Sequence, residues 1–185
     1  MAKQFPSIDS RLSDFISRQH IFFTGSAAPA GRVNVSPKPA TALRILGPNQ
    51  VVYLDQTGSS NETAAHLGQL NRLTIMFCAV EGPPQILRLY GSGRVIRRES
   101  AEYAELLAGP FEGNEPPGAR QMILIDIDLV QTSCGFGVPL FDYRGERGSL
   151  DRWADNKSPE ELEAYQREKN QVSLDGYPTG LFAAE

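Results

Sequence analysis

The chain has 185 residues, with 22 acidic and 18 basic side chains, which give a formal net charge of −4 at pH 7. This acidic balance argues against a nucleic-acid-binding protein, because such a protein needs a basic face. No apolar run is long enough to predict a transmembrane helix, and the opening MAKQFPSIDSRL lacks the apolar core of a signal peptide. We therefore expect a cytoplasmic protein with neither nucleic acid nor membrane as a partner.

The first part of the chain is predicted to consist mainly of strands. Residues 7–19 place apolar side chains at helical spacing and predict a short opening helix. Extended segments follow, and one of them, residues 31–39, alternates between valines on one face and polar side chains on the other. Its two prolines end the strand or place it at a sheet edge. A short helix is expected at about residues 61–70.

The second part of the chain adds three long strands and further helices. Residues 71–80 form an almost continuous apolar run and predict a central strand. Gly91 and Gly93 interrupt the next strand, as glycines do at a bulge or a barrel corner. Beyond residue 149 the sequence turns helical, with Ser158 as a predicted N-cap. Six or seven strands with mostly short connections favour a small antiparallel barrel over a doubly wound sheet.

The loop TGSSNETAAHL, residues 57–67, is the clearest candidate for a binding site. Backbone amides and small hydroxyl side chains at the start of a helix can hold a phosphate without a charged side chain. The residues concerned are Gly58, Ser59, Ser60, Asn61 and Thr63. Two alternatives stay open here. One is ordinary helix capping by Ser60 or Asn61, and the other is N-glycosylation of Asn61, which requires a secreted protein.

No catalytic triad or metal site is predicted. Neither histidine, His20 or His66, has an evident partner in the sequence, and the spacing of Cys78 and Cys134 matches no zinc pattern. The polar face of RVNVSPK would suit a polar ligand, although a solvated edge strand has the same pattern. If the protein is an enzyme, we expect a cofactor to supply the chemistry.

Several segments, taken in order, carry a resemblance to a known family. They are FFTGSAAPAGRVNVSPKP, VVYLDQTGSSNETAAHL, NRLTIMFCAVEGPPQILRLYGSGRV, IDIDLVQTSCGFGVP and KNQVSLDGYPTG. Together they resemble the pyridoxamine 5'-phosphate oxidase-like proteins, and in particular a little-characterised bacterial subgroup. The resemblance implies a mainly β fold: a six-stranded antiparallel split barrel of the FMN-binding type in residues 1–140. Residues 141–185 would form a C-terminal helical extension that packs on the barrel or on a partner subunit.

The resemblance also implies a homodimer with FMN at the subunit interface. The strand RVNVSPK would lie along the flavin and ribityl chain, the loop after YLD would hold the phosphate, and Gln85 would reach the flavin of the other subunit. The implied FMN-binding residues are Arg32, Val33, Asn34, Val35, Ser36, Lys38, Leu54, Asp55, Gly58, Ser59, Ser60, Asn61, Thr63 and Gln85.

This chain departs from the vitamin B6 oxidase in the phosphate loop, which has Ser-Ser-Asn-Glu-Thr in place of an Arg-Lys pair. We expect either a lower affinity for FMN or compensation by an arginine elsewhere in the chain, for which the candidates are Arg32, Arg88 and Arg94. The hypothesis is an FMN-dependent oxidoreductase that uses NAD(P)H or a small organic substrate. Its catalytic residues are not identified. The alternative is a non-catalytic module that binds FMN, another flavin-like cofactor or haem. Haem is disfavoured because it would need His20, His66 or Cys134 as its ligand.

Overall fold

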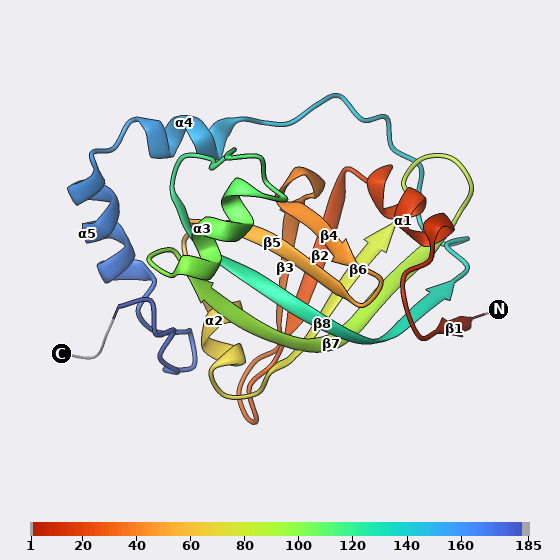
Figure 1. Cartoon of the computed structure of the whole chain (residues 1–185), viewed down its shortest axis with the longest axis horizontal. Coiled ribbons are helices and arrows are strands. Elements are labelled where there is room, and N and C mark those ends of the chain that lie inside the picture. Colours follow the sequence, from red (N-terminus) through yellow and green to blue (C-terminus); the bar gives the residue numbers. More distant parts are fainter. Residues whose placement is uncertain (1, 183–185) are drawn as a thin grey trace.

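Eight antiparallel strands form one curled sheet within residues 2–182, the part of the chain that this computed structural model describes (Figure 1). The strands are β1 Lys3–Phe5, β2 Ile21–Ser26, β3 Asn34–Pro39, β4 Leu43–Gly47, β5 Gln50–Gln56, β6 Arg72–Cys78, β7 Ile86–Arg97 and β8 Ala119–Ser133. Their order is β3-β2-β6-β7-β8-β5-β4, and β1 pairs with β8. The predicted mainly β architecture is confirmed, with β6 inside the sheet and the proline-containing β3 at its edge.

Within residues 2–182 the sheet has eight strands, more than the six or seven that the sequence pattern predicts. β1 has three residues and no apolar alternation, so its sequence carries no strand signal. It forms because β8 is 15 residues long and extends beyond its pairing with β5, which ends at Asp126. The free end of β8 then pairs with β1 through Val130, Gln131 and Thr132. This pairing satisfies backbone groups that would otherwise lack partners.

The helices agree with the sequence patterns. They are α1 Ser10–Ser17, the 3₁₀ turn η1 Ala40–Ala42, α2 Glu62–Leu67, α3 Ala101–Ala108, α4 Ser149–Asp155 and α5 Pro159–Lys169. The predicted cap of α5 is confirmed, since Ser158 and Glu161 form a reciprocal capping box. α2 is shorter than expected because Gly68 follows its last residue. Residues 183–185, the last three of the expected C-terminal extension, lie outside the described residues.

Two apolar clusters lie on the two faces of the central strands. The barrel cluster includes fully buried Phe22, Tyr53, Ile75, Leu89 and Ile125. The second cluster joins the outer faces of β5, β7 and β8 to α3, and it includes Val52, Leu54, Ile96, Met122, Leu124 and Tyr103. Because α3 covers this outer side, β5 and the first half of β8 are buried on both faces. These stretches therefore read as continuous apolar runs and not as alternating ones.

The predicted irregularity in β7 is confirmed at Gly91. The register of β7 against β8 shifts between Tyr90 and Gly91. A Cβ atom at position 91 would clash with the backbone carbonyl of Asp126. Only glycine permits this approach, which bends the strand and helps to curl the sheet.

A crossing segment, residues 134–148, leads from β8 along the outside of the barrel to α4 (Figure 1). The amide of Phe141 donates to the carbonyl of Val80 (2.9 Å), and the amide of Tyr143 donates to Glu81 (3.0 Å). The Tyr143 ring also stacks on His20, with 3.7 Å between the ring centroids. The crossing segment is thus attached near its middle and carries α4 and α5 to the far side of the barrel. The expected domain division at residue 140 stays a prediction.

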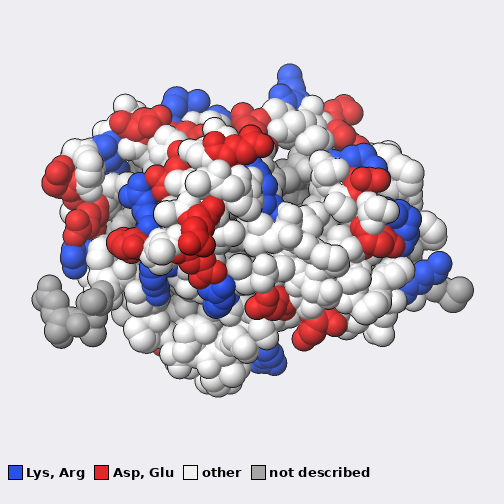
Figure 2. Space-filling model, viewed as in Figure 1, with Lys and Arg blue, Asp and Glu red and all other residues white. Residues whose placement is uncertain are grey.

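The surface charge and the helix lengths can be compared with the expectation that neither nucleic acid nor a membrane is a partner. On the face that Figure 2 shows, acidic and basic side chains are interspersed and no large basic patch is seen. Across residues 2–182, none of the helices has the length and apolarity that crossing a bilayer requires.

Candidate cofactor site

The polar side of β3 faces the protein, toward the loop between β5 and α2. Asn34 Nδ2 donates to Thr63 Oγ1 (3.2 Å) and to Ser26 Oγ (3.3 Å), and Ser36 Oγ donates to Asn34 Oδ1 (3.1 Å). Asn34 and Ser36 are half-buried, whereas Val35 is 64% exposed. The alternative of a solvated polar face is therefore wrong for this strand. β3 presents hydrogen-bonding groups inward and apolar groups outward.

A buried charge cluster lies beside this face, centred on Asp55. Lys38 Nζ lies 2.6 Å from one carboxylate oxygen, and Arg120 and Gln121 each donate to the other at 2.9 Å. Burial opposes ionisation of Asp55, but Arg120 and Lys38 outweigh it and hold the pKa of this carboxyl well below its usual range. Two cations face one carboxylate, so the cluster carries an excess positive charge.

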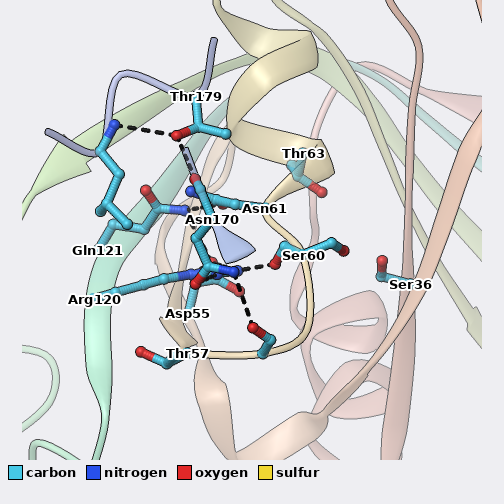
Figure 3. A network of polar contacts seen from close by, with 12 residues as sticks. Ser36, Asp55, Thr57, Ser60, Asn61, Thr63, Arg120, Gln121, Asn170 and Thr179 are labelled. Atoms are coloured by element: carbon cyan, nitrogen blue, oxygen red, sulfur yellow. Dashed lines mark hydrogen bonds and ion pairs between the residues drawn. The ribbon is translucent and has the colours of Figure 1, made fainter. Parts of the chain in front are cut away.

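Arg120 and Gln121 extend this cluster to the predicted phosphate loop. Arg120 donates to the carbonyl of Ser60 (2.9 Å) and to Asn170 Oδ1 (2.8 Å), and Gln121 donates to Asn61 Oδ1 (2.7 Å). Figure 3 shows these side chains converging on the loop from β8 and from the segment after α5. Positive charge therefore reaches the loop from β8.

The three arginines expected to supply that charge are engaged elsewhere. Arg32, Arg88 and Arg94 contact Asp175, Ser133 and Glu102, respectively. Arg120 lies beside the loop in their place, because β8 pairs with β5 in a register that sets Asp55 opposite Gln121. No local signal in the sequence reveals this register.

The loop itself does not behave as an ordinary helix cap. Asn61 occupies the N-cap position of α2, but its side chain makes no capping hydrogen bond. It is 2% exposed, so it also offers no acceptor for a glycan. Ser59 and Ser60 are exposed. Both alternatives to a binding loop are therefore weakened at Asn61.

Three buried side-chain polar atoms in residues 2–182 lack a hydrogen-bond partner: Tyr53 Oη, Asn61 Nδ2 and His66 Nε2. All three belong to the short stretch from β5 to α2. Burial, followed by the charge of Asp55, raises the pKa of Tyr53 above its usual range, so this hydroxyl stays protonated. Buried polar atoms are normally paired with protein or water. The hydrogen-bonding capacity of these three atoms is therefore left over for partners that are not protein side chains.

The two histidines have partners that the sequence did not reveal. His66 Nδ1 lies 3.0 Å from Ser26 Oγ, and its Nε2 lies 4.0 Å from Glu62. Ser26 is 3% and His66 1% exposed, so this pair cannot meet a substrate as a nucleophile and base. His20 Nε2 lies 3.3 Å from Glu81. Within residues 2–182, no three metal-ligating side chains form a cluster.

A groove of about 1220 Å³ lies between the barrel and the crossing segment. Lys38 and Leu54 of the predicted set line it, together with Phe23, Phe111 and Phe141. Lys38 thus contributes both to the charge cluster and to the groove.

The structure brings most of the predicted residues together. Those in one connected region are Asn34, Ser36, Lys38, Asp55, Gly58, Ser59, Ser60, Asn61 and Thr63, whereas Leu54 packs in the outer apolar cluster with α3. Val33 and Val35 point outward, and Arg32 turns to the C-terminal segment. Gln85 precedes β7, eight residues before Gly93, which packs beside α2. The distance from Gln85 to Gly93 is therefore roughly 25 Å along the strand. The role of Gln85 in a partner's site stays a prediction.

Comparison with known proteins agrees with this architecture. The family model described as pyridoxamine 5'-phosphate oxidase matches residues 8–134. A curated relative from Aspergillus flavus, "Pyridoxamine 5'-phosphate oxidase family protein ustO", is 38% identical over 198 residues, covering 97% of this chain and 78% of the relative.

Two solved structures confirm the split-barrel fold. A single-residue variant of HupZ from Group A Streptococcus has a TM-score of 0.57 and 17% identity, over 68% of this chain and 99% of that one. A putative pyridoxamine 5'-phosphate oxidase from Lactobacillus delbrueckii has a TM-score of 0.53 and 16% identity, over 68% and 94%. The family model and the curated relative, together with the fold, show that this chain belongs to the pyridoxamine 5'-phosphate oxidase family.

Proposed function

We propose that this protein is an FMN-binding flavoprotein and acts as an FMN-dependent oxidoreductase on a small substrate. The cofactor would lie along the polar side of β3, with its phosphate at the loop before α2. The observation that carries this proposal is the set of unpaired buried polar atoms between residues 53 and 66. It coincides with the segment that the family resemblance assigns to the cofactor.

The side chains of this region suit a phosphate and a ribityl chain. Asn61 Nδ2 is a buried donor without an acceptor, and the exposed Ser59 and Ser60 hydroxyls can donate as well. Phosphate oxygens would supply the missing acceptors. Hydrogen bonds to a charged acceptor are about twice as strong as those between neutral groups.

The charge cluster explains how a loop without lysine or arginine could hold an anion. The excess positive charge of Lys38 and Arg120 over Asp55 is buried, where electrostatic interactions are weakly screened. Arg120 is 6% exposed and held by Asp55 and Asn170, so it would act through its field and not by contact. The loop would then bind phosphate through hydroxyls, the Asn61 amide and backbone groups.

FMN, when bound, supplies hydride and electron transfer. The protein would hold the cofactor, exclude water and admit the substrate through the groove that Lys38 and Leu54 line. NAD(P)H or a small organic molecule would be the reductant. We propose the cytoplasm as the location.

We further propose a homodimer with the cofactor site at its interface. Val33, Val35, Phe136, Leu140 and Phe141 are each 60% or more exposed, which a monomer would leave in water. A partner subunit covering them would also bring its Gln85 to the site. Light scattering at micromolar concentration should give a dimer, and a monomer would contradict the shared site.

The central experiment is a titration with FMN, followed by quenching of flavin fluorescence. Asn61→Ala should raise the dissociation constant about 10- to 100-fold, because a hydrogen bond to a charged group contributes roughly 1.5–3 kcal/mol. Asn156→Ala, at an exposed position directly after α4, is the matched control and should bind as the wild type does. The absence of saturable binding of FMN to the wild-type protein would refute the proposal.

A non-catalytic flavin-binding module is the second candidate. It is favoured by the engagement of Asp55, His20 and His66 with protein partners, which leaves these groups poorly placed to move a substrate proton. Anaerobic addition of NADH or NADPH to the FMN complex separates the two candidates. Loss of the visible flavin absorbance supports the oxidoreductase, whereas a flavin that only dithionite reduces supports the module.

A further inference from the structure

The C-terminal loop, residues 171–180, folds back onto the segments that flank the proposed phosphate site. It is a closed turn in which the amide of Ser173 donates to the carbonyl of Tyr177 (2.8 Å) and that of Thr179 to Gln171 (2.9 Å). Figure 1 shows this part of the chain, after α5, beside α2 and the end of β7. The loop is thus ordered by its own hydrogen bonds.

The tip of the C-terminal loop contacts the segment before β3 and the first residue of α2. Asp175 accepts from the backbone amide of Arg32 (2.6 Å) and from its guanidinium, just before β3. The neighbouring amide of Leu174 donates to Glu62 (3.0 Å), the first residue of α2. Asp175 therefore binds the backbone amide and the guanidinium of Arg32, one of the residues that the family resemblance assigns to FMN.

The base of the C-terminal loop is attached far more firmly than its tip. Asn170 and Thr179 are 0% and 3% exposed. Asn170 donates to the carbonyl of Gly58 (3.0 Å) and accepts from Arg120, and Thr179 donates to the carbonyl of Asn170 (2.7 Å). At the tip, by contrast, the side chain of Arg32 is 70% exposed and that of Asp175 is 13% exposed. An ion pair with one partner in water is weaker than a fully buried one, so the tip can leave Arg32 while the base stays in place.

Asp175 also has the chemistry of a phosphate substitute. It is an anion bound by a backbone amide and a guanidinium, which are the donors that bind phosphates in proteins. The Arg32 amide, ahead of the charge on its side chain, holds the pKa of Asp175 below its usual range, so the carboxylate is ionised at neutral pH. A phosphate dianion would bind the same donors more strongly.

We propose that Asp175 is an internal competitor of the cofactor phosphate: it sequesters Arg32 in the free protein, and FMN binding displaces it. This inference rests on the proposed FMN site. The C-terminal loop would then restrain cofactor uptake. An anionic ligand would have to replace the Asp175 carboxylate before it engages Arg32.

The test measures FMN association and affinity by stopped-flow flavin fluorescence on the full chain. Asp175→Asn keeps the size of the side chain and removes its charge. It should raise both the association rate and the affinity by roughly two- to fivefold, the range expected for an ion pair with one partner exposed to water. Asp128→Asn, an exposed position on β8, makes the same charge change and should have no effect. Asp175→Ala is the second variant should the asparagine disturb the loop.

A double variant shows whether the effect passes through Arg32. In an Arg32→Gln background, Asp175→Asn should give no further gain. If the wild-type protein binds FMN but Asp175→Asn binds it equally or more weakly, or if the gain persists without Arg32, the competitor role is overturned while the FMN site stands. If neither the wild type nor the variants bind FMN, the proposed function fails and this inference fails with it.

Discussion

Replacing Arg120 with methionine tests the buried charge cluster directly. Methionine keeps much of the length of the side chain and removes the guanidinium, which bonds to Asp55, to the carbonyl of Ser60 and to Asn170. The Arg120 and Asp55 side chains are each 4% exposed. The substitution therefore removes one of the two cations that contact the buried Asp55 carboxylate. It also removes the hydrogen-bond donor of the Ser60 carbonyl and of Asn170 Oδ1.

The expected loss of unfolding free energy is about 3–5 kcal/mol, the cost of removing one partner from a buried ion pair. Lys38, 2.6 Å from Asp55, still compensates part of the charge. The unpaired Ser60 carbonyl and Asn170 add a desolvation cost that offsets this compensation. For a chain of this size the loss lowers the melting temperature by roughly 6–20 °C, at about 2–4 °C per kcal/mol.

Urea denaturation, followed by circular dichroism and by the fluorescence of Trp153, the only tryptophan, measures this loss. Arg98→Met is the matched control, because Arg98 is 52% exposed and pairs with Glu115 at the surface. It should cost about 0–1 kcal/mol. Equal losses of unfolding free energy for Arg120→Met and Arg98→Met would refute the view that the charges around Asp55 are buried and strongly coupled.

Three further predictions concern acid stability, strand packing and a helix cap. The depressed pKa of Asp55 stabilises the folded protein fully above about pH 4, the ordinary pKa of an aspartate, and this stability is lost as the pH falls toward the lower pKa of the folded state. The difference in unfolding free energy between the wild type and Arg120→Met should therefore become smaller in acid. Gly91→Ala should lose about 1–3 kcal/mol or more in urea denaturation, since its Cβ meets the Asp126 carbonyl, whereas Gly47→Ala, where a Cβ meets nothing within 4 Å, should lose much less. Ser158→Ala removes the capping box of α5 and should cost about 1 kcal/mol, seen as a melting-temperature fall of roughly 2–4 °C; an unchanged value would show that the cap is dispensable.

Features with a local physical cause were predictable from the sequence. The cap of α5 depends on Ser158 and Glu161, three residues apart. The edge position of β3 follows from prolines that cannot donate a ladder hydrogen bond, and the bulge in β7 follows from Gly91. The loop before α2 was also identified, because clustered small polar residues are a local signal. Each of these depends on residues close together in the chain.

Features made by distant residues were not predictable in this way. Arg120 and Asp55 are 65 positions apart, and Asn170 and Gly58 are 112 apart. β1 forms only because the end of β8 lacks another partner. Glu81 beside His20 and Ser26 beside His66 likewise come from other elements.

The sequence by itself determined the family, the mainly β fold and a polar loop before α2 that lacks lysine and arginine. The tertiary structure decided which charges stand beside that loop. The register of β8 on β5 places Arg120 against Asp55, and the returning C-terminal segment places Asn170 on Gly58 and Asp175 on Arg32. The physical reason is that strand register and chain return are set by the burial and hydrogen bonding of the whole sheet, which no local pattern encodes.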